Sequence, residues 1–196
     1  IERTRESDFS VALLGGLSQL NGDVNDGATF PGAKRPWLWT VNLPVFYRFD
    51  TEDIPLFGET DLILRGGLSF NRIQGDYPGF SVTNWVTGLY AAFETDFRDF
   101  AGIGGPVQPY LYAGPAYVWH TPNVENISPQ HQVRRQYQDG TGSSAMAALF
   151  GGGLRWQLSE RIEILAGYEK VLTFTDALDH FVSGRNDNVA GVSLGV

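Results

Sequence analysis

Apolar and polar residues alternate along two neighbouring stretches near the end of the chain. In residues 150–158 and 162–174 nearly every second residue is apolar, and the short polar turn 159–161 separates the two stretches. Such alternation puts the apolar side chains on one face of an extended strand and the other side chains on the opposite face. The pattern therefore predicts a β-hairpin with two unlike faces, and it leaves open which face is the core.

The same alternation recurs along the chain and predicts eight strands. They cover residues 8–20, 36–49, 60–72, 80–97, 109–121, 145–158, 162–174 and 188–196. Most are longer than the roughly five or six residues usual in globular sheets. They reach the length of about 9–11 residues that a tilted membrane-spanning strand needs. Helical spacing appears only in short stretches broken by Gly or Pro, so the chain is expected to be all-β.

The aromatic residues indicate what the apolar face meets. All five tryptophans fall on that face, four toward one end of the strands and one toward the other: Trp37, Trp39, Trp85 and Trp119, then Trp156. Two aromatic belts separated by an aliphatic band are typical of a β-barrel in a bilayer, because amphipathic rings settle at headgroup depth. A soluble core gives no reason to sort tryptophans to strand ends. The apolar face is therefore predicted to face lipid, with these tryptophans at the lipid interfaces.

The opposite face carries charges among many glycines. Its charged residues include Arg48, Arg65, Glu94, Arg155, Glu163 and Glu169. Inside a narrow barrel, glycines leave room for larger side chains and opposite charges can pair. We expect Arg65 and Arg155 to pair there with Glu94, Glu169 or both, because an unpaired buried charge is costly.

These patterns together predict a closed antiparallel eight-stranded transmembrane β-barrel that forms a single domain over residues 1–196. A soluble sandwich or barrel is the alternative. Both termini would lie at one end, together with the turns 50–59, 98–108 and 159–161. The other end would carry the loops 21–35, 73–79, 122–144 and 175–187, which are mostly longer and more polar, as in outer-membrane barrels.

Three residues fit this barrel poorly. Pro44 and Pro115 lie within strands, where proline removes a ladder donor, so we expect local bulges there. Lys170 falls on the lipid-facing register in mid-strand. Either its side chain snorkels to the interface or a bulge shifts the register.

Composition narrows the chemistry further. The formal net charge is −8 and the pI about 4.8, so no basic stripe exists for nucleic acid. Cysteine is absent, which removes disulfides, thiolate metal sites and a Cys nucleophile. The histidines His120, His131 and His180 have no partner at metal-ligand spacing. We expect no catalytic residue, no cofactor and no metal.

Two polar segments allow a functional and a structural interpretation. The segment 175–188 is rich in oxygen ligands suited to Ca²⁺, at Asp176, Asp179, Asn186, Asp187 and Asn188. It matches no EF-hand spacing, and a loop that caps its own turns is the preferred interpretation. Ser143 and Ser144 lack the G-x-S-x-G context of a nucleophile and are assigned to a flexible loop.

Two segments resemble a known family. DFSVALLGGLSQLNGDVNDG, residues 8–27, resembles the first strand and outer loop of small eight-stranded outer-membrane barrels of the Bacteroidetes, which are OmpA-like in architecture. TFTDALDHFVSGRNDNVAGVSLGV, residues 173–196, resembles their closing segment. The resemblance implies a stand-alone barrel, an anchor of a peptidoglycan-binding domain, or an accessory barrel of a secretion or gliding machine. That family usually closes with an aromatic residue, so we expect the natural chain to continue past Val196.

The leading functional hypothesis is a non-enzymatic anchor in the outer membrane, or an accessory subunit of an envelope or secretion complex. Its expected partners are outer-membrane lipid and either other envelope proteins or peptidoglycan, the latter through a C-terminal domain. The alternative is an outer-membrane lipid-modifying enzyme, although no His–Ser or paired-carboxylate constellation is evident at the loop ends. A pore is not favoured, because side chains fill an eight-stranded barrel. The loop 122–144, with His131, Arg134, Arg135 and Tyr137, is the expected recognition surface.

Overall fold

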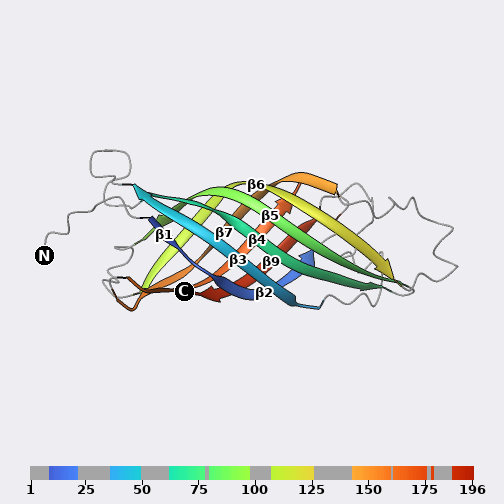
Figure 1. Ribbon diagram of the computed structural model, residues 1–196, viewed down its shortest axis with the longest axis horizontal. Coiled ribbons are helices and arrows are strands. Elements are labelled where there is room, and N and C mark those ends of the chain that lie inside the picture. Colours follow the sequence, from blue (N-terminus) through green and yellow to red (C-terminus); the bar gives the residue numbers. More distant parts are fainter. Residues whose placement is uncertain are drawn as a thin grey trace, which may run out of the picture.

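The computed structural model is a barrel built from nine consecutive β-segments (Figure 1). It describes residues 9–21, 36–49, 62–77, 80–97, 107–125, 143–159, 161–175, 178 and 187–196. The strands are β1 (Phe9–Val11), β2 (Leu14–Asn21), β3 (Leu38–Phe49), β4 (Leu62–Tyr77), β5 (Phe80–Asp96), β6 (Val107–Glu125), β7 (Ser143–Gln157), β8 (Glu163–Thr173) and β9 (Asn188–Gly195). None of the described residues forms a helix long and apolar enough to cross a membrane.

Antiparallel pairing runs around the whole sheet and closes it. Each strand from β3 to β8 pairs with the next in sequence, and β2 pairs with both β9 and β3. The segments β1 and β2 both pair with β3 in one continuous register, so together they form the first of eight strands. The predicted closed eight-stranded barrel is therefore confirmed, and the sandwich alternative is wrong. The start of β1 and the end of β9 lie at the same end, called the terminal end here; the opposite end is the far end (Figure 1).

The prolines interrupt the ladder without bulges. The pairs Val11–Val45 and Leu14–Asn42 follow the same register on either side of Pro44. The gap between β1 and β2 lies opposite this proline, whose carbonyl still accepts from the Ala12 amide at 3.0 Å. Pro115 also pairs in register, with Ala148. The expectation of bulges was wrong, because a missing N–H removes a ladder hydrogen bond but adds no residue.

Lys170 keeps the outward register that its position in the alternation predicts. It pairs with Phe150 on β7 and Ala190 on β9, inside unbroken ladders. Tyr168 and Leu172 on either side of it are exposed. A register shift is therefore excluded, and the snorkelling interpretation is the one that fits.

Strands β4, β6 and β7 extend further than predicted. β7 begins at Ser143, so Ser143 and Ser144 belong to a strand and not to the flexible loop to which they were assigned. β4 continues to Tyr77 and pairs there with Phe80, so most of the predicted loop 73–79 belongs to a long hairpin. β6 continues to Glu125, which pairs with Ser81. The hairpin of β4 and β5 therefore projects beyond the apolar belt at the far end, where polar residues interrupt the alternation.

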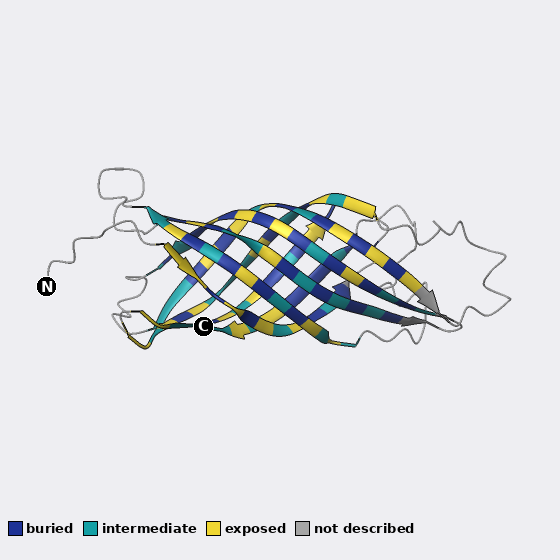
Figure 2. Ribbon diagram, in the orientation of Figure 1, coloured by how far each residue is buried: buried dark blue, intermediate teal, exposed yellow. Residues whose placement is uncertain are grey.

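Burial alternates residue by residue along the strands, as Figure 2 shows. The outward face carries exposed apolar side chains, and all five tryptophans belong to it with exposed fractions from 41% for Trp39 to 51% for Trp85. The inward face carries the buried residues. The inward set is more apolar than the sequence indicated, since it includes Leu14, Leu20 and Ile63.

Glycines on the inward face make room for tyrosines. A Cβ atom on Gly151 would lie 2.5 Å from the Tyr112 hydroxyl, and one on Gly167 would lie 2.6 Å from the Tyr110 hydroxyl. Each tyrosine thus reaches across a neighbouring strand at a point that lacks a side chain. This arrangement is the structural reason for the glycine-rich run in β7.

Replacing Gly151 with alanine is expected to destabilise the barrel by about 1–3 kcal/mol, because the new methyl group overlaps the ring of Tyr112 and the carbonyl of Tyr168. Gly15 is the matched control, since a Cβ there meets no atom within 4 Å. Urea unfolding in detergent, followed by the heat-modifiable mobility of the folded barrel, measures both variants. Equal stabilities for the two variants would contradict this packing.

Candidate functional site

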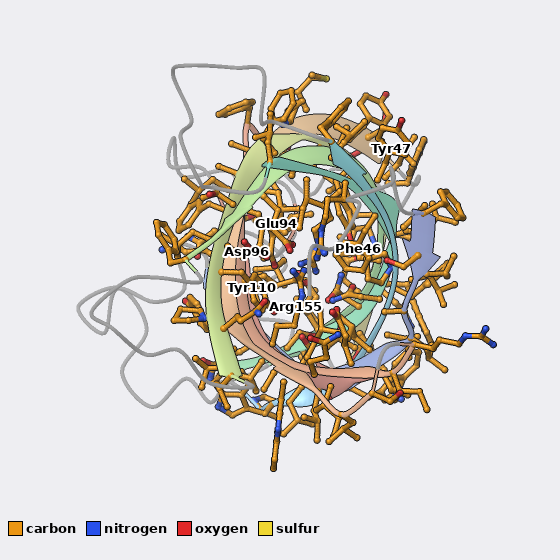
Figure 3. All side chains as sticks on the ribbon, turned by 90° about the vertical axis from the view of Figure 1, so that its left-hand side faces the viewer. Phe46, Tyr47, Glu94, Asp96, Tyr110 and Arg155 are labelled. Carbon is orange, nitrogen blue, oxygen red and sulfur yellow. The ribbon has the colours of Figure 1, made fainter. Side chains whose placement is uncertain are left out.

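The inside of the barrel holds a cluster of charged side chains near the terminal end. Arg65 of β4, Glu94 and Asp96 of β5 and Arg155 of β7 are all almost completely buried. Figure 3, seen from the terminal end, shows Glu94, Asp96 and Arg155 pointing into the lumen, while Tyr47 points outward. Two cations and two anions are therefore enclosed in one space by three different strands.

Every member of this cluster is paired. Arg65 Nη1 lies 3.0 Å from Glu94 Oε2. Arg155 forms ion pairs with Glu94 through Nη2 and with Asp96 through Nη1, the latter at 3.3 Å. Its Nε lies 3.2 Å from Glu163 Oε2, at the more exposed edge of the cluster. Glu94 thus bridges the two arginines, and the enclosed charges balance.

Aromatic rings surround the two guanidinium groups. Arg65 Cζ lies 4.0 Å from the centroid of the Tyr112 ring and 5.3 Å from that of Phe46. Arg155 Cζ lies 5.5 Å from the Tyr110 centroid and 5.8 Å from Phe46. Cation–π contacts of this kind add to the ion pairs where water is excluded. The cluster is held rigidly, which suits a structural plug better than a mobile binding site.

Glu169 lies apart from the arginines, in the middle of the lumen. Its Oε1 accepts a hydrogen bond from Asn42 Nδ2 at 3.0 Å, and its Oε2 accepts one from the Tyr112 hydroxyl at 3.1 Å. Of the carboxylates expected to pair with Arg65 and Arg155, only Glu94 does so among the ion pairs of the described residues. Asp96 takes the second place, because Glu169 stands level with Gly151 rather than with Arg155, whose partner on β8 is Leu165.

One described residue of the 175–187 segment, Leu178, lies inside the far end of the lumen. Leu178 is fully buried in a cluster with residues of the surrounding strands. Its carbonyl accepts from Asn84 Nδ2 at 2.7 Å, and its amide donates to Asp187 Oδ2 at 2.8 Å. Asp187 thus ties Leu178 to the start of the last strand, and both residues are buried rather than solvated. Asp176, Asp179 and Asn186, considered for Ca²⁺, lie outside the described residues.

A histidine and a serine meet at the far end, contrary to the expectation that no His–Ser pair would occur at the loop ends. Ser143 Oγ is hydrogen-bonded to His120 Nε2, and the two residues are cross-strand partners on β7 and β6. His120 Nδ1 has no hydrogen-bond partner among the described residues, whereas catalytic histidines are oriented by a third group. The pair therefore acts as a tie between two strands. Sequence reasoning missed it because 23 residues separate its members.

One small cavity lies inside the barrel among the described residues. This cavity of about 10 Å³ is lined by Tyr90, Glu169 and six other residues, and it has room for about one water molecule. In the described parts of the chain, no three His, Cys, Asp or Glu side chains gather in a way that would hold a metal ion. The expected recognition loop 122–144 lies outside the described residues, except for its ends.

Comparison with known proteins finds relatives in fold. No protein-family model matches the chain, and no curated protein does. Among solved structures, Neisserial surface protein A matches with 14% identity and a TM-score of 0.58 over 97% of both chains. Ail, the attachment invasion locus protein of Yersinia pestis, matches with 15% identity and a TM-score of 0.50, over 97% of this chain and 96% of its own. The resemblance to a Bacteroidetes type finds no support in these matches.

Fold and interior together define the class. This chain has the fold of the small eight-stranded outer-membrane β-barrels, with an outward apolar belt and a filled lumen.

Truncating Arg155 to alanine is expected to lower the free energy of unfolding by about 3–5 kcal/mol, because Glu94 and Asp96 would stay buried with one cation fewer. Arg48→Ala is the matched control: Arg48 lies at the rim, 4.0 Å from Asp96, with 26% of its side chain exposed. Arg48→Ala is expected to lower the free energy of unfolding by less than about 1 kcal/mol. Unfolding in detergent by urea measures both, and a stable Arg155→Ala barrel would contradict the network.

Proposed function

We propose that this protein is an integral, non-enzymatic barrel of the bacterial outer membrane. The observation that carries the proposal is the outward belt, in which every tryptophan is exposed and lies toward one end or the other of an aliphatic band. Tryptophan is selected at both interfaces of a bilayer, and an outward apolar band of this kind is what lipid-facing strands require. In water the same surface would be an aggregation hazard.

The interior supports a structural role. Arg65 and Arg155 are paired with carboxylates inside the barrel. Tyrosine rings fill the space beside Gly151 and Gly167, and Leu178 is fully buried at the far end. A transport channel needs a continuous polar path, and side chains fill the interior of an eight-stranded barrel. The His120–Ser143 pair is the one feature that favours a lipid-modifying enzyme, and it lacks an orienting group among the described residues. An anchor, in which the barrel is a rigid scaffold, fits best.

The finer role that we propose is an OmpA-like anchor or accessory subunit of an envelope or secretion complex. The wall of such a barrel faces lipid and its lumen is filled, so recognition falls to the segments between strands. Functional residues are commonly carried by loops on a rigid scaffold. The longest of these segments, 122–144, holds Arg134 and Arg135 and is the candidate contact with other envelope proteins.

Insertion can be tested through the tryptophans. Refolded into phosphatidylcholine vesicles with brominated acyl chains, the barrel is expected to lose most of its tryptophan fluorescence relative to unbrominated vesicles, because all five indoles point outward. The matched sample is the urea-unfolded chain mixed with the same vesicles, which should be quenched little. Fluorescence that survives in the folded sample would show that the belt does not meet lipid.

The recognition surface can be tested by deleting residues 125–140 and joining the ends with a short Gly-Ser link. The barrel is expected to insert as before, while cross-linked envelope partners that co-purify with the full chain are lost. Co-purification of the same partners with the deletion variant would move the recognition surface to the turns 50–59 and 98–108.

A further inference from the structure

Arg72 of β4 points out of the barrel. Its neighbours Asn71 and Ile73 are buried in the lumen, so the alternation of the strand directs Arg72 to the outward face. Among the described strand residues it is the one arginine on that face. A cation on a lipid-facing surface costs free energy toward the middle of the bilayer and little near the interfaces. An outward arginine is therefore expected near a membrane interface rather than at the middle of the bilayer.

Two tryptophans of the far-end belt flank this arginine. Trp85 on β5 is its cross-strand partner. On the other side, Trp39 of β3 directly precedes Thr40, and Thr40 pairs with Asn71, the residue before Arg72. The two indole rings lie 5.2 Å apart between centroids, at an interplanar angle of 70°. Because their strands lie on either side of β4, the indoles meet across the strand that carries Arg72.

The guanidinium contacts one ring of this aromatic pair, and one of its donors has no hydrogen-bond partner among the described residues. Arg72 Cζ lies 5.8 Å from the centroid of the Trp85 ring. Its Nε is buried and has no hydrogen-bond partner among the described residues. Trp39 and Trp85 themselves stay exposed. A guanidinium offers parallel N–H donors that match the oxygens of a phosphate group.

We propose that Trp39, Arg72 and Trp85 form a binding site for the phosphate group of a membrane lipid. The inference rests on the proposed function, because insertion places the tryptophan belt at headgroup depth, where lipid phosphates lie. The net charge of −8 repels anions from the molecule as a whole, so an anion needs a local cation to bind. Arg72 supplies that cation, and the indoles exclude water around it.

The chain offers two matched controls. Lys170 is also an outward cation, but its cross-strand partners are Phe150 and Ala190 and no tryptophan flanks it. Trp119 belongs to the same belt as Trp85 and packs edge-on against Tyr117, with 4.9 Å between the ring centroids. Its cross-strand partner on β7 is Ser144, so no arginine stands beside it there. Lys170 tests for a general charge effect, and Trp119 tests for a general aromatic effect.

The test uses the full chain folded in an uncharged detergent, with folding verified by heat-modifiable mobility. Short-chain phosphatidic acid is titrated and its binding is measured by native mass spectrometry, with the matching diacylglycerol as the uncharged lipid. Arg72→Gln is expected to weaken phosphatidic acid binding about tenfold or more, as for loss of a charged hydrogen bond. Arg72→Lys should recover part of the affinity, since it keeps the charge without the planar fork. Diacylglycerol binding should not change.

Three results would overturn the site. The first is an unchanged affinity of Arg72→Gln for phosphatidic acid. The second and third are a loss of affinity in Lys170→Gln, or in Trp119→Leu, as large as the loss in Arg72→Gln. Displacement of the lipid by inorganic phosphate at equal concentration would assign the site to free phosphate instead. A wild-type barrel that fails to enter vesicles contradicts the proposed function, whereas one that inserts but binds phosphatidic acid without Arg72 contradicts this site alone.

Discussion

Closing eight strands into a barrel leaves an interior only wide enough for side chains to fill, and the rest of this structure follows from that constraint. No strand has a free long edge, so backbone groups are satisfied within the wall, and the interior must pack without voids. Large side chains can enter only where the wall lacks a side chain. Gly151 and Gly167 provide those places for Tyr112 and Tyr110.

The same narrowness decides how charge is accommodated. Removing water from Arg65 and Arg155 is expensive unless each keeps an opposite charge and its remaining surface is in contact with polarizable groups. Glu94 and Asp96 supply the charge, and the rings of Phe46 and the tyrosines supply the contact. Since the enclosed arginines and carboxylates balance, the cluster stabilises the barrel only as a unit. Removing one member leaves a buried charge without its partner, which destabilises the barrel more than replacing the whole cluster with apolar side chains would.

A filled lumen shifts function to the outside of the molecule. Leu178 is buried at the far end of the lumen, and Asn84 and Asp187 hold it there through its backbone. The outward wall then has two kinds of surface. One is the apolar band, and the other is the tryptophan belt, in which Arg72 contacts Trp85 beside the Trp39–Trp85 pair. We propose that the band anchors the molecule and that Arg72 in the belt binds lipid phosphate.

The sequence by itself determined the eight strands, the face of each and the outward tryptophans, because period-two alternation is a local property of every strand. It also identified Arg65, Glu94 and Arg155 as inward residues. It did not determine that Asp96 rather than Glu169 completes the charge cluster, that His120 meets Ser143, or that Arg72 lies beside Trp39 and Trp85. Those contacts join different strands, and only the register and closure of the tertiary structure set which residues of neighbouring strands stand at the same level.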